Sequence, residues 1–288
     1  MRFKKLNGYL AILIVLMLLV TACGQAGPKK VDIAVFHADS LAGPMKELKA
    51  AFEAKNPDVN VTLVSGKSKD LAGQIMSGFP CDVFTPSDPK VIKDSLLDKK
   101  IPNSDKVGAT WSVVFSANEM VIVTKKGNPL GIKQVSDLAK ADVKLARVNS
   151  ATDMATARTV TFVTKATEAE GQKDLAKKII DGATSVDNIP AAIKALQDGS
   201  VNTAIMYYSS AVTIQNDFDV LRYPADVNLS SEIRNAATIP GTAGQKEAAA
   251  KFISLILSPE GQEILKKTGQ PPVVPPIKDG NVPPEINF

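Results

Sequence analysis

The fold is decided by residues 31–63, whose sequence is VDIAVFHADSLAGPMKELKAAFEAKNPDVNVTL. Its first six residues, Val31–Phe36, form a short apolar run that is typical of a strand. Apolar residues then recur at helical spacing from Pro44 to Phe52, and apolar and polar residues alternate over Val59–Leu63 as on a half-buried strand. A strand, a helix and a second strand in direct succession predict a parallel α/β architecture.

The same alternation of strands and helices runs along the rest of the chain. We expect further strands at 82–85, 120–124, 143–147, 203–206, 220–221 and 233–239, and helices at 71–76, 89–97, 135–140, 153–164, 168–181, 190–197, 243–257 and 259–269. The proline-rich tail from Pro271 is expected to be extended on the surface. A chain of 288 residues suits two domains of about 100–150 residues each. Our prediction is two α/β lobes with crossings near 117–120 and 226–234, so that residues 31–117 and 234–288 form lobe 1 and residues 118–233 form lobe 2.

The N-terminus has the pattern of a secretion signal. Three basic residues within the first five precede the 11 apolar residues Leu10–Val20, a run that is too short to span a membrane. The following Val20-Thr21-Ala22-Cys23-Gly24 resembles the site at which bacterial lipoproteins are cleaved and lipidated. We therefore predict a signal peptide at 1–22, lipidation of Cys23, a lipid-anchored linker at 23–30 and an extracytoplasmic protein on the bacterial cell membrane. The alternative is an ordinary secreted protein that is cut near Ala22.

Removal of this segment changes the charge of the chain. The full sequence has 34 basic and 30 acidic residues, and without residues 1–22 the count is 31 against 30. A nearly neutral mature chain gives no support to nucleic-acid binding. With 2 Cys and 1 His, the sequence also excludes a multi-histidine metal site and a CxxC redox site.

Small polar residues stand where several helices are expected to begin. They are Ser40, Ser68, Ser87, Thr152 and Asn188. Each one alone is most simply an N-cap. Together they lie at the carboxyl edge of an α/β sheet, where ligands bind and where helix N-termini favour anions. His37 and Asp39 belong to the first of these junctions, and a carboxylate beside a bound dianion is unfavourable unless it is protonated, points away or joins the coordination.

Seven short blocks resemble the molybdate/tungstate-binding proteins of ABC importers. In the first half they are VFHADSL at 35–41, SGKS at 65–68, LAGQI at 71–75 and GFPCDVF at 78–84, the last followed by Ser87-Asp88. In the second half they are weaker: 187–189, 205–209 and the C-terminal 269–272. The resemblance implies a two-lobed periplasmic-binding-protein fold of type II, with parallel or mixed sheets flanked by helices and a ligand cleft between the lobes. It also implies a monomeric receptor without a cofactor that passes a tetrahedral oxyanion, molybdate or tungstate, to a membrane permease.

The resemblance carries over to individual positions. The implied ligand-binding residues are Ser40, Ser68, Ser87, Ala155, Ile189 and Tyr207, through hydroxyl or backbone N–H donors. Asp39 stands where the family usually has Gly or Ala, and Asp153 falls near a carboxylate that completes a six-coordinate site in the tungstate branch. No metal is implied beyond molybdate or tungstate itself.

Two alternatives stay open at this point. The same two-lobed receptor could take another oxyanion, an organic anion or a metal complex, because of Asp39, Asp153 and Met154-Ala155-Thr156, which replaces the family's Pro-Ala-Gly. The less favoured alternative is a secreted hydrolase that uses His37 with Ser40, for which no oxyanion-hole motif or oriented triad is evident. We expect a binding protein and not an enzyme.

Overall fold

The computed structural model describes residues 30–288. The predicted signal peptide, Cys23 and all of the linker except Lys30 lie outside the described residues. Within residues 30–288, no helix has both the length and the apolar character that crossing a membrane requires.

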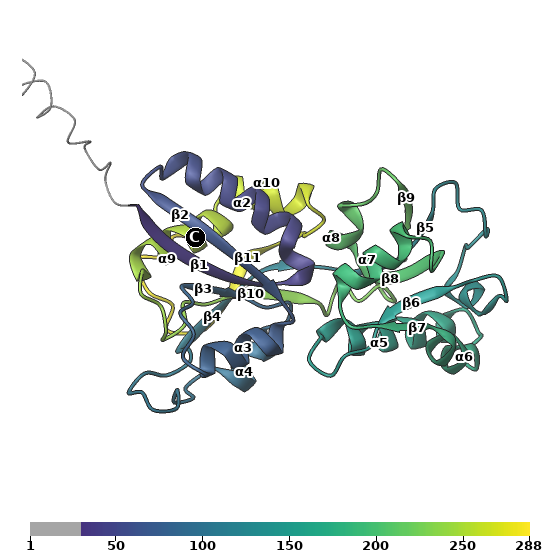
Figure 1. Ribbon diagram of the computed structural model, residues 1–288, viewed down its shortest axis with the longest axis horizontal. Coiled ribbons are helices and arrows are strands. Elements are labelled where there is room, and N and C mark those ends of the chain that lie inside the picture. Colours follow the sequence, from purple (N-terminus) through teal and green to yellow (C-terminus); the bar gives the residue numbers. More distant parts are fainter. Residues whose placement is uncertain (1–29) are drawn as a thin grey trace, which may run out of the picture. The chain divides into compact units, whose positions relative to one another are not determined.

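The first sheet is parallel, as the opening stretch predicts. It contains β1 (Val31–Ala38), β2 (Val59–Gly66) and β3 (Val83–Thr85) in the order β2-β1-β3. Both pairs are parallel, with Val31 opposite Val59 and Val35 opposite Val83. Each strand leads into a helix: α2 (Ala42–Lys55) after a 3₁₀ turn at Asp39–Leu41, α3 (Ser68–Met76) and α4 (Pro89–Ser95). This arrangement brings the three strand-to-helix junctions to one edge of the sheet (Figure 1).

The second sheet is antiparallel and contains a strand that the sequence analysis missed. Its order is β10 (Arg234–Ala237), β4 (Trp111–Ala117) and β11 (Pro272–Gly280). We assigned no strand to β4, because nearly all of it is buried and it lacks the alternation of a half-buried strand. The proline-rich tail is extended and mostly exposed as predicted, but its residues also pair with β4 as an edge strand. The long helices α9 (Lys246–Leu257) and α10 (Pro259–Lys267) follow β10.

The third sheet is mixed and follows directly from β4. Its order is β7 (Thr184–Val186), β6 (Leu145–Val148), β8 (Thr203–Tyr207), β5 (Met120–Lys125) and β9 (Phe218–Leu221). β6 runs parallel to β7 and β8, whereas β5 is antiparallel to β8 and β9. Its helices are α5 (Met154–Ala169), α6 (Leu175–Gly182), α7 (Ile189–Gln197) and α8 (Tyr208–Val212). The helix expected at 135–140 is a 3₁₀ helix, and the one expected at 168–181 begins later because α5 continues to Ala169.

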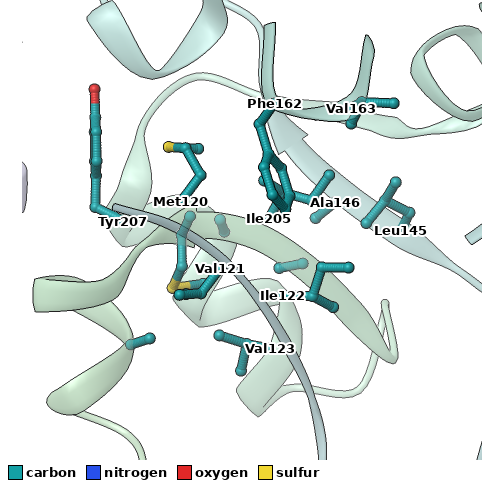
Figure 2. Packing of buried hydrophobic residues seen from close by; sticks show 14 of the residues in the cluster. Met120, Val121, Ile122, Val123, Leu145, Ala146, Phe162, Val163, Ile205 and Tyr207 are labelled. Atoms are coloured by element: carbon teal, nitrogen blue, oxygen red, sulfur yellow. The ribbon is translucent and has the colours of Figure 1, made fainter. Parts of the chain in front are cut away.

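The buried side chains follow the same division into sheets. The residues of one hydrophobic cluster all lie between Met120 and Ile233, and Figure 2 shows part of it around β5 and Phe162. The other two clusters draw their buried residues from 33–115 and 236–286. We call the part with the first two sheets lobe 1 and the part with the third sheet lobe 2. The boundary positions 117/118 and 233/234 stay a prediction.

The core of lobe 2 gives a direct test of the fold. Phe162 on α5 is fully buried and packs edge-to-face on Tyr223 at a centroid distance of 5.5 Å. We expect Phe162→Ala to lower the free energy of unfolding by about 3–5 kcal/mol, because it leaves a cavity in the core. Val160, on the same helix but 38% exposed, is the matched control, and Val160→Ala should change stability by less than about 1 kcal/mol. Urea unfolding followed by circular dichroism measures both, and equal losses would contradict this packing.

Candidate functional site

A small cavity lies where the strand ends of lobe 1 meet lobe 2. Its volume is about 10 Å³, close to the room that one water molecule needs. The lining residues are Ala38, Asp39, Ser40, Gly66, Lys67, Ser68, Ser87, Asp153, Ile189 and Tyr207. Seven of these were singled out from the sequence as certain or conditional ligand residues. Ala155 is the predicted ligand residue that is not among them.

A much larger cavity of about 890 Å³ lies elsewhere on lobe 1. Trp111, Ile239 and Glu285 are among its lining residues, and none of the predicted site residues is. Volume alone does not identify a ligand site. The small cavity is the better candidate because it joins the two lobes and because buried polar groups face it.

The helix caps differ from the sequence prediction at four of the five junctions. Only Asn188 caps its helix as expected, accepting from the Ala191 N–H at 2.9 Å. α4 is capped by Asp88 and α5 by Asp153, each one residue after the serine or threonine that we had expected. A carboxylate is as good an N-cap as a hydroxyl, and the neighbouring acid takes the position.

Two serines therefore lie at helix starts without capping them. Ser68 is the first residue of α3, whose N-cap position is Lys67, and Ser40 lies inside the 3₁₀ turn before α2. Ordinary capping, which was the simplest explanation for these residues, does not account for them. Both residues line the cavity instead.

Two hydroxyls at the cavity are buried without a hydrogen-bond partner among the described residues. They belong to Ser40 in lobe 1 and Tyr207 at the end of β8 in lobe 2, and the residues are only 3% and 1% exposed. Figure 2 shows the Tyr207 hydroxyl directed away from the other labelled side chains of its cluster. Burial raises the pKa of Tyr207 well above its usual value, and the Asp153 carboxyl raises it further. The nearby Ser87 hydroxyl lowers this pKa, but it does not form a well-aligned hydrogen bond with the Tyr207 hydroxyl. The phenol therefore stays protonated and able to donate.

The other predicted donors are partly in use. The Ser87 N–H donates to Ser68 Oγ at 3.1 Å, and the two hydroxyls of this pair are 3.2 Å apart. The Ala155 N–H donates to Asp153 Oδ1 at 2.8 Å, so this predicted donor is already in use. Ile189 begins α7, so its N–H has no carbonyl acceptor within its own helix.

Two carboxylates also line the cavity, one from each lobe. Asp39 Oδ1 accepts from Ser65 Oγ at 2.6 Å, which holds this side chain on the rim. Burial raises the pKa of Asp153 to about 6, the charges of Asp39 and Asp187 raise it too, and the Ala155 N–H and Lys67 act in the opposite direction. The Asp153 carboxyl thus changes its protonation state near neutral pH.

Lys67 is a lining residue to which the sequence analysis gave no role. Its ammonium group binds Asp187 at 2.7 Å and Ser150 Oγ at 3.2 Å, both in lobe 2. The hydrogen bond to Asp187 is the main reason why the pKa of Lys67 is raised. The sequence could have pointed to Lys67 through its position between β2 and α3, because we expected the ligand at that edge of the sheet.

Further contacts join the two lobes near the cavity. The Thr152 hydroxyl donates to Asp70 at 3.1 Å, and Arg158 pairs with the buried Asp88 at 2.7 Å. Lobe 2 is therefore attached to the starts of α3 and α4 by charged and polar side chains. This arrangement is that of a closed cleft.

His37 does not form the pair that a hydrolase would require. The ring is buried and its Nδ1 lies 2.9 Å from the Ala38 carbonyl oxygen, while Ser40 Oγ has no hydrogen-bond partner among residues 30–288. Burial lowers the pKa of His37. A base and its nucleophile need to be within hydrogen-bond reach, and these two residues make no such bond.

Known proteins share this sequence and this fold. The chain is 25% identical over 269 residues to the molybdate-binding protein of Mycobacterium tuberculosis, which covers 87% of this chain and 92% of that protein. It is 22% identical over 322 residues to the molybdate/tungstate-binding protein of Pyrococcus abyssi, covering 91% of this chain and 90% of that one.

The structural comparison concerns the fold alone, because the identity is low. The periplasmic molybdate-binding protein of Azotobacter vinelandii has a TM-score of 0.64 at 18% identity and covers 84% of this chain and 99% of that one. This likeness confirms the predicted two-lobed periplasmic-binding-protein fold. Residues 33–270 also match the sequence pattern of a family described as bacterial extracellular solute-binding protein. The chain therefore belongs to the bacterial extracellular solute-binding proteins.

Proposed function

We propose that this protein is the receptor of an ABC importer and captures a tetrahedral oxyanion, molybdate or tungstate, between its lobes. One observation carries the proposal: the buried hydroxyls of Ser40 and Tyr207, one from each lobe, face the same cavity without a partner. Relatives with molybdate or molybdate and tungstate in their names support the choice of ligand. The role is binding, and no residue is assigned a catalytic step.

The donors suit an ion that carries only acceptors. An unpaired buried hydroxyl costs about 1–3 kcal/mol, and a fully ionised oxyanion removes that cost by accepting from it. Ser40 and Ser68 from lobe 1, together with the Ile189 N–H and the Tyr207 phenol from lobe 2, would surround such an ion. The Ser87 N–H would join them if Ser68 turned its hydroxyl toward the ion. A protonated oxyanion would bind less well among these donors, because its O–H group would find no hydrogen-bond acceptor there.

The size of the cavity limits the choice of ligand. The cavity has room for about one water molecule, so its walls must move outward for an ion of four oxygens, and further still for a larger organic acid. Movement of two lobes about connecting segments is the usual way for a binding protein to make such room. Asp39 and Asp153 still favour one alternative, an oxyanion that carries a proton or a bound cation. Each carboxylate could accept a hydrogen bond from that proton or bind that cation.

We further propose a tethered location for the receptor. Lipidation of Cys23 would hold the protein on the outer face of the cell membrane, and residues 24–30 would give it reach. The permease would then recognise the closed form of the two lobes.

The first prediction separates ligand binding from stability. Ser40→Ala and Tyr207→Phe each remove a buried hydroxyl that has no partner, so the ligand-free protein should keep its melting temperature or gain in it. The same variants should weaken molybdate binding by about 10- to 100-fold, the value of a hydrogen bond to a charged group. Calorimetry and thermal melting measure the two effects.

Tyr223→Phe is the matched control. The Tyr223 hydroxyl is also buried without a partner among the described residues, but Tyr223 is not among the residues that line the cavity. This variant should bind molybdate and tungstate as the unaltered protein does. If neither ion, nor sulfate or phosphate, shifts the melting temperature of the unaltered protein at millimolar concentration, the oxyanion proposal fails.

The second prediction concerns pH. Because the pKa of Asp153 is raised to about 6, its carboxyl is charged at pH 7.5 and half protonated at pH 6.0. Loss of this charge removes repulsion of the dianion, so molybdate affinity should increase by up to about tenfold between pH 7.5 and 6.0. Asp153→Asn should flatten this dependence and bind at least as tightly at pH 7.5. If Asp153→Asn instead weakens binding at both pH values, the carboxylate coordinates the ion in a six-coordinate site.

The third prediction concerns the anchor. In the native host, Cys23→Ser should move the protein from the membrane fraction to the soluble fraction, and mass spectrometry should find no diacylglycerol on it. Cys81→Ala is the control, because Cys81 is a buried free cysteine that donates to the Val83 carbonyl within lobe 1. An unchanged membrane fraction for Cys23→Ser would contradict lipid anchoring.

A further inference from the structure

Ser40 is held from two directions through its backbone carbonyl. This oxygen accepts from Ser209 Oγ of α8 at 2.6 Å, across the interface between the lobes. It also accepts a longer hydrogen bond, 3.5 Å, from the side-chain amide of Gln270, which lies between α10 and β11. The direction of this carbonyl fixes the peptide plane of Ser40, and with it the direction in which the Ser40 side chain leaves the backbone.

Each of these two donors is held in turn by a residue at a connection between the lobes. Two segments connect the second and third sheets, Asn118-Glu119 between β4 and β5 and residues 222–233 between β9 and β10; we call them the crossing segments. Ser209 Oγ accepts from Asn118 Nδ2 at 2.9 Å, in the first crossing segment. Gln270 Oε1 accepts from Asn235 Nδ2 at 2.6 Å, at the start of β10 just after the second.

These hydrogen-bond chains are fully enclosed. Ser209 and Asn118 are each 1% exposed, and Gln270 and Asn235 are 0% exposed. Buried polar networks fix one arrangement of their members, since any other arrangement leaves groups unpaired in a medium of low dielectric constant. Ser209 belongs to lobe 2, whereas Gln270 and Ser40 both belong to lobe 1. A rotation of the lobes about the crossing segments would therefore move Ser209 relative to Ser40, while Gln270 would keep its place beside the Ser40 carbonyl.

The local sequence allows this close approach. Gly269 has a φ of +77°, and a Cβ there would come within 3.1 Å of the Ser209 Cα. A larger residue would separate Gln270 from α8. Gly269 also ends α10 in the usual way, because the Gln270 N–H donates to the Leu265 carbonyl at 2.8 Å and the Gly269 N–H donates to the Lys266 carbonyl at 3.2 Å.

We propose that Ser209 and Gln270 are positioning residues that couple closure of the lobes to the ligand-binding geometry of Ser40. In this scheme Ser209 and Gln270 do not touch the ion. They turn the Ser40 hydroxyl toward it only when the crossing segments adopt the closed arrangement. The inference rests on the proposed function, because it takes Ser40 as a ligand residue.

The test is a double-mutant cycle with molybdate as the ligand. Ser209→Ala, measured by calorimetry, should weaken the affinity by about five- to tenfold, the value of one hydrogen bond. In a Ser40→Ala background the same substitution should change the affinity by less than about twofold, because the group on which it acts is gone. A purely structural role would lower affinity equally in both backgrounds.

Controls keep the outcomes distinct. Ser254→Ala removes a serine that also donates to a backbone carbonyl, that of Ala250, but within α9, and it should leave affinity unchanged in both backgrounds. Gln270→Met retains length without hydrogen bonds and should show the same dependence on Ser40; it replaces Ser209→Ala if that variant does not fold. Suppose that the unaltered protein binds molybdate. If the effects of Ser209→Ala and Ser40→Ala on affinity are then additive, or if Ser209→Ala leaves the affinity unchanged, the positioning role is overturned and the proposed function is not. If the unaltered protein binds no oxyanion, the proposed function fails and this inference fails with it.

Discussion

The structure depends on a constraint that holds throughout protein interiors: a buried polar group needs a hydrogen-bond partner. Asp88 at the edge of the first sheet and Asp153 at the edge of the third satisfy it internally by capping their helices. Ser40 and Tyr207 do not, at a cost of about 1–3 kcal/mol each. The apolar cores of the two lobes supply the stability that makes this cost tolerable. The unpaired hydroxyls are then available to a ligand.

The charges near the cavity do not favour an anion, because neither the net charge of the protein nor the local charge is strongly positive. Residues 23–288 are nearly neutral, with 31 basic and 30 acidic residues. Near the cavity, Asp39, Asp153 and Asp187 lie around Lys67, which is already paired with Asp187. In the proposed function, an anion would therefore be held by oriented donors at short range. Such donors act most strongly where water is excluded, because a low local dielectric constant strengthens hydrogen bonds. The affinity therefore depends on closure of the lobes more than on the charge of the protein.

The sequence predicted the parallel sheet and most elements because alternation and helical spacing are local signals. It missed β4, which is buried on both faces and therefore carries no alternation. Sheet-edge reasoning placed Asp39, Ser40, Ser68 and Ser87 at strand-to-helix junctions, and these residues line the cavity. Asp153, Ile189 and Tyr207, which also line it, were named only through the family resemblance. The sequence could not show that Asp88 and Asp153, rather than their neighbours, cap the helices, because both residue types are good caps. Nor could it give Lys67 a role, since its partner Asp187 lies 120 positions away and is brought near only by the tertiary fold.

The position of Asp39 can be understood from the same constraint. A carboxylate in the 3₁₀ turn Asp39–Leu41 would repel a dianion if it pointed into the cavity. Ser65 donates to Asp39 Oδ1 at 2.6 Å and so restrains that oxygen. The pKa of Asp153 is raised to about 6, so its repulsion of an anion would fall as the pH falls through this value. Neither of these residues has to leave for an anion to enter. For an anion to bind, the Ser40 hydroxyl must point toward it. The Ser40 carbonyl accepts hydrogen bonds from both lobes, so in our proposal this direction is fixed only when the lobes are closed.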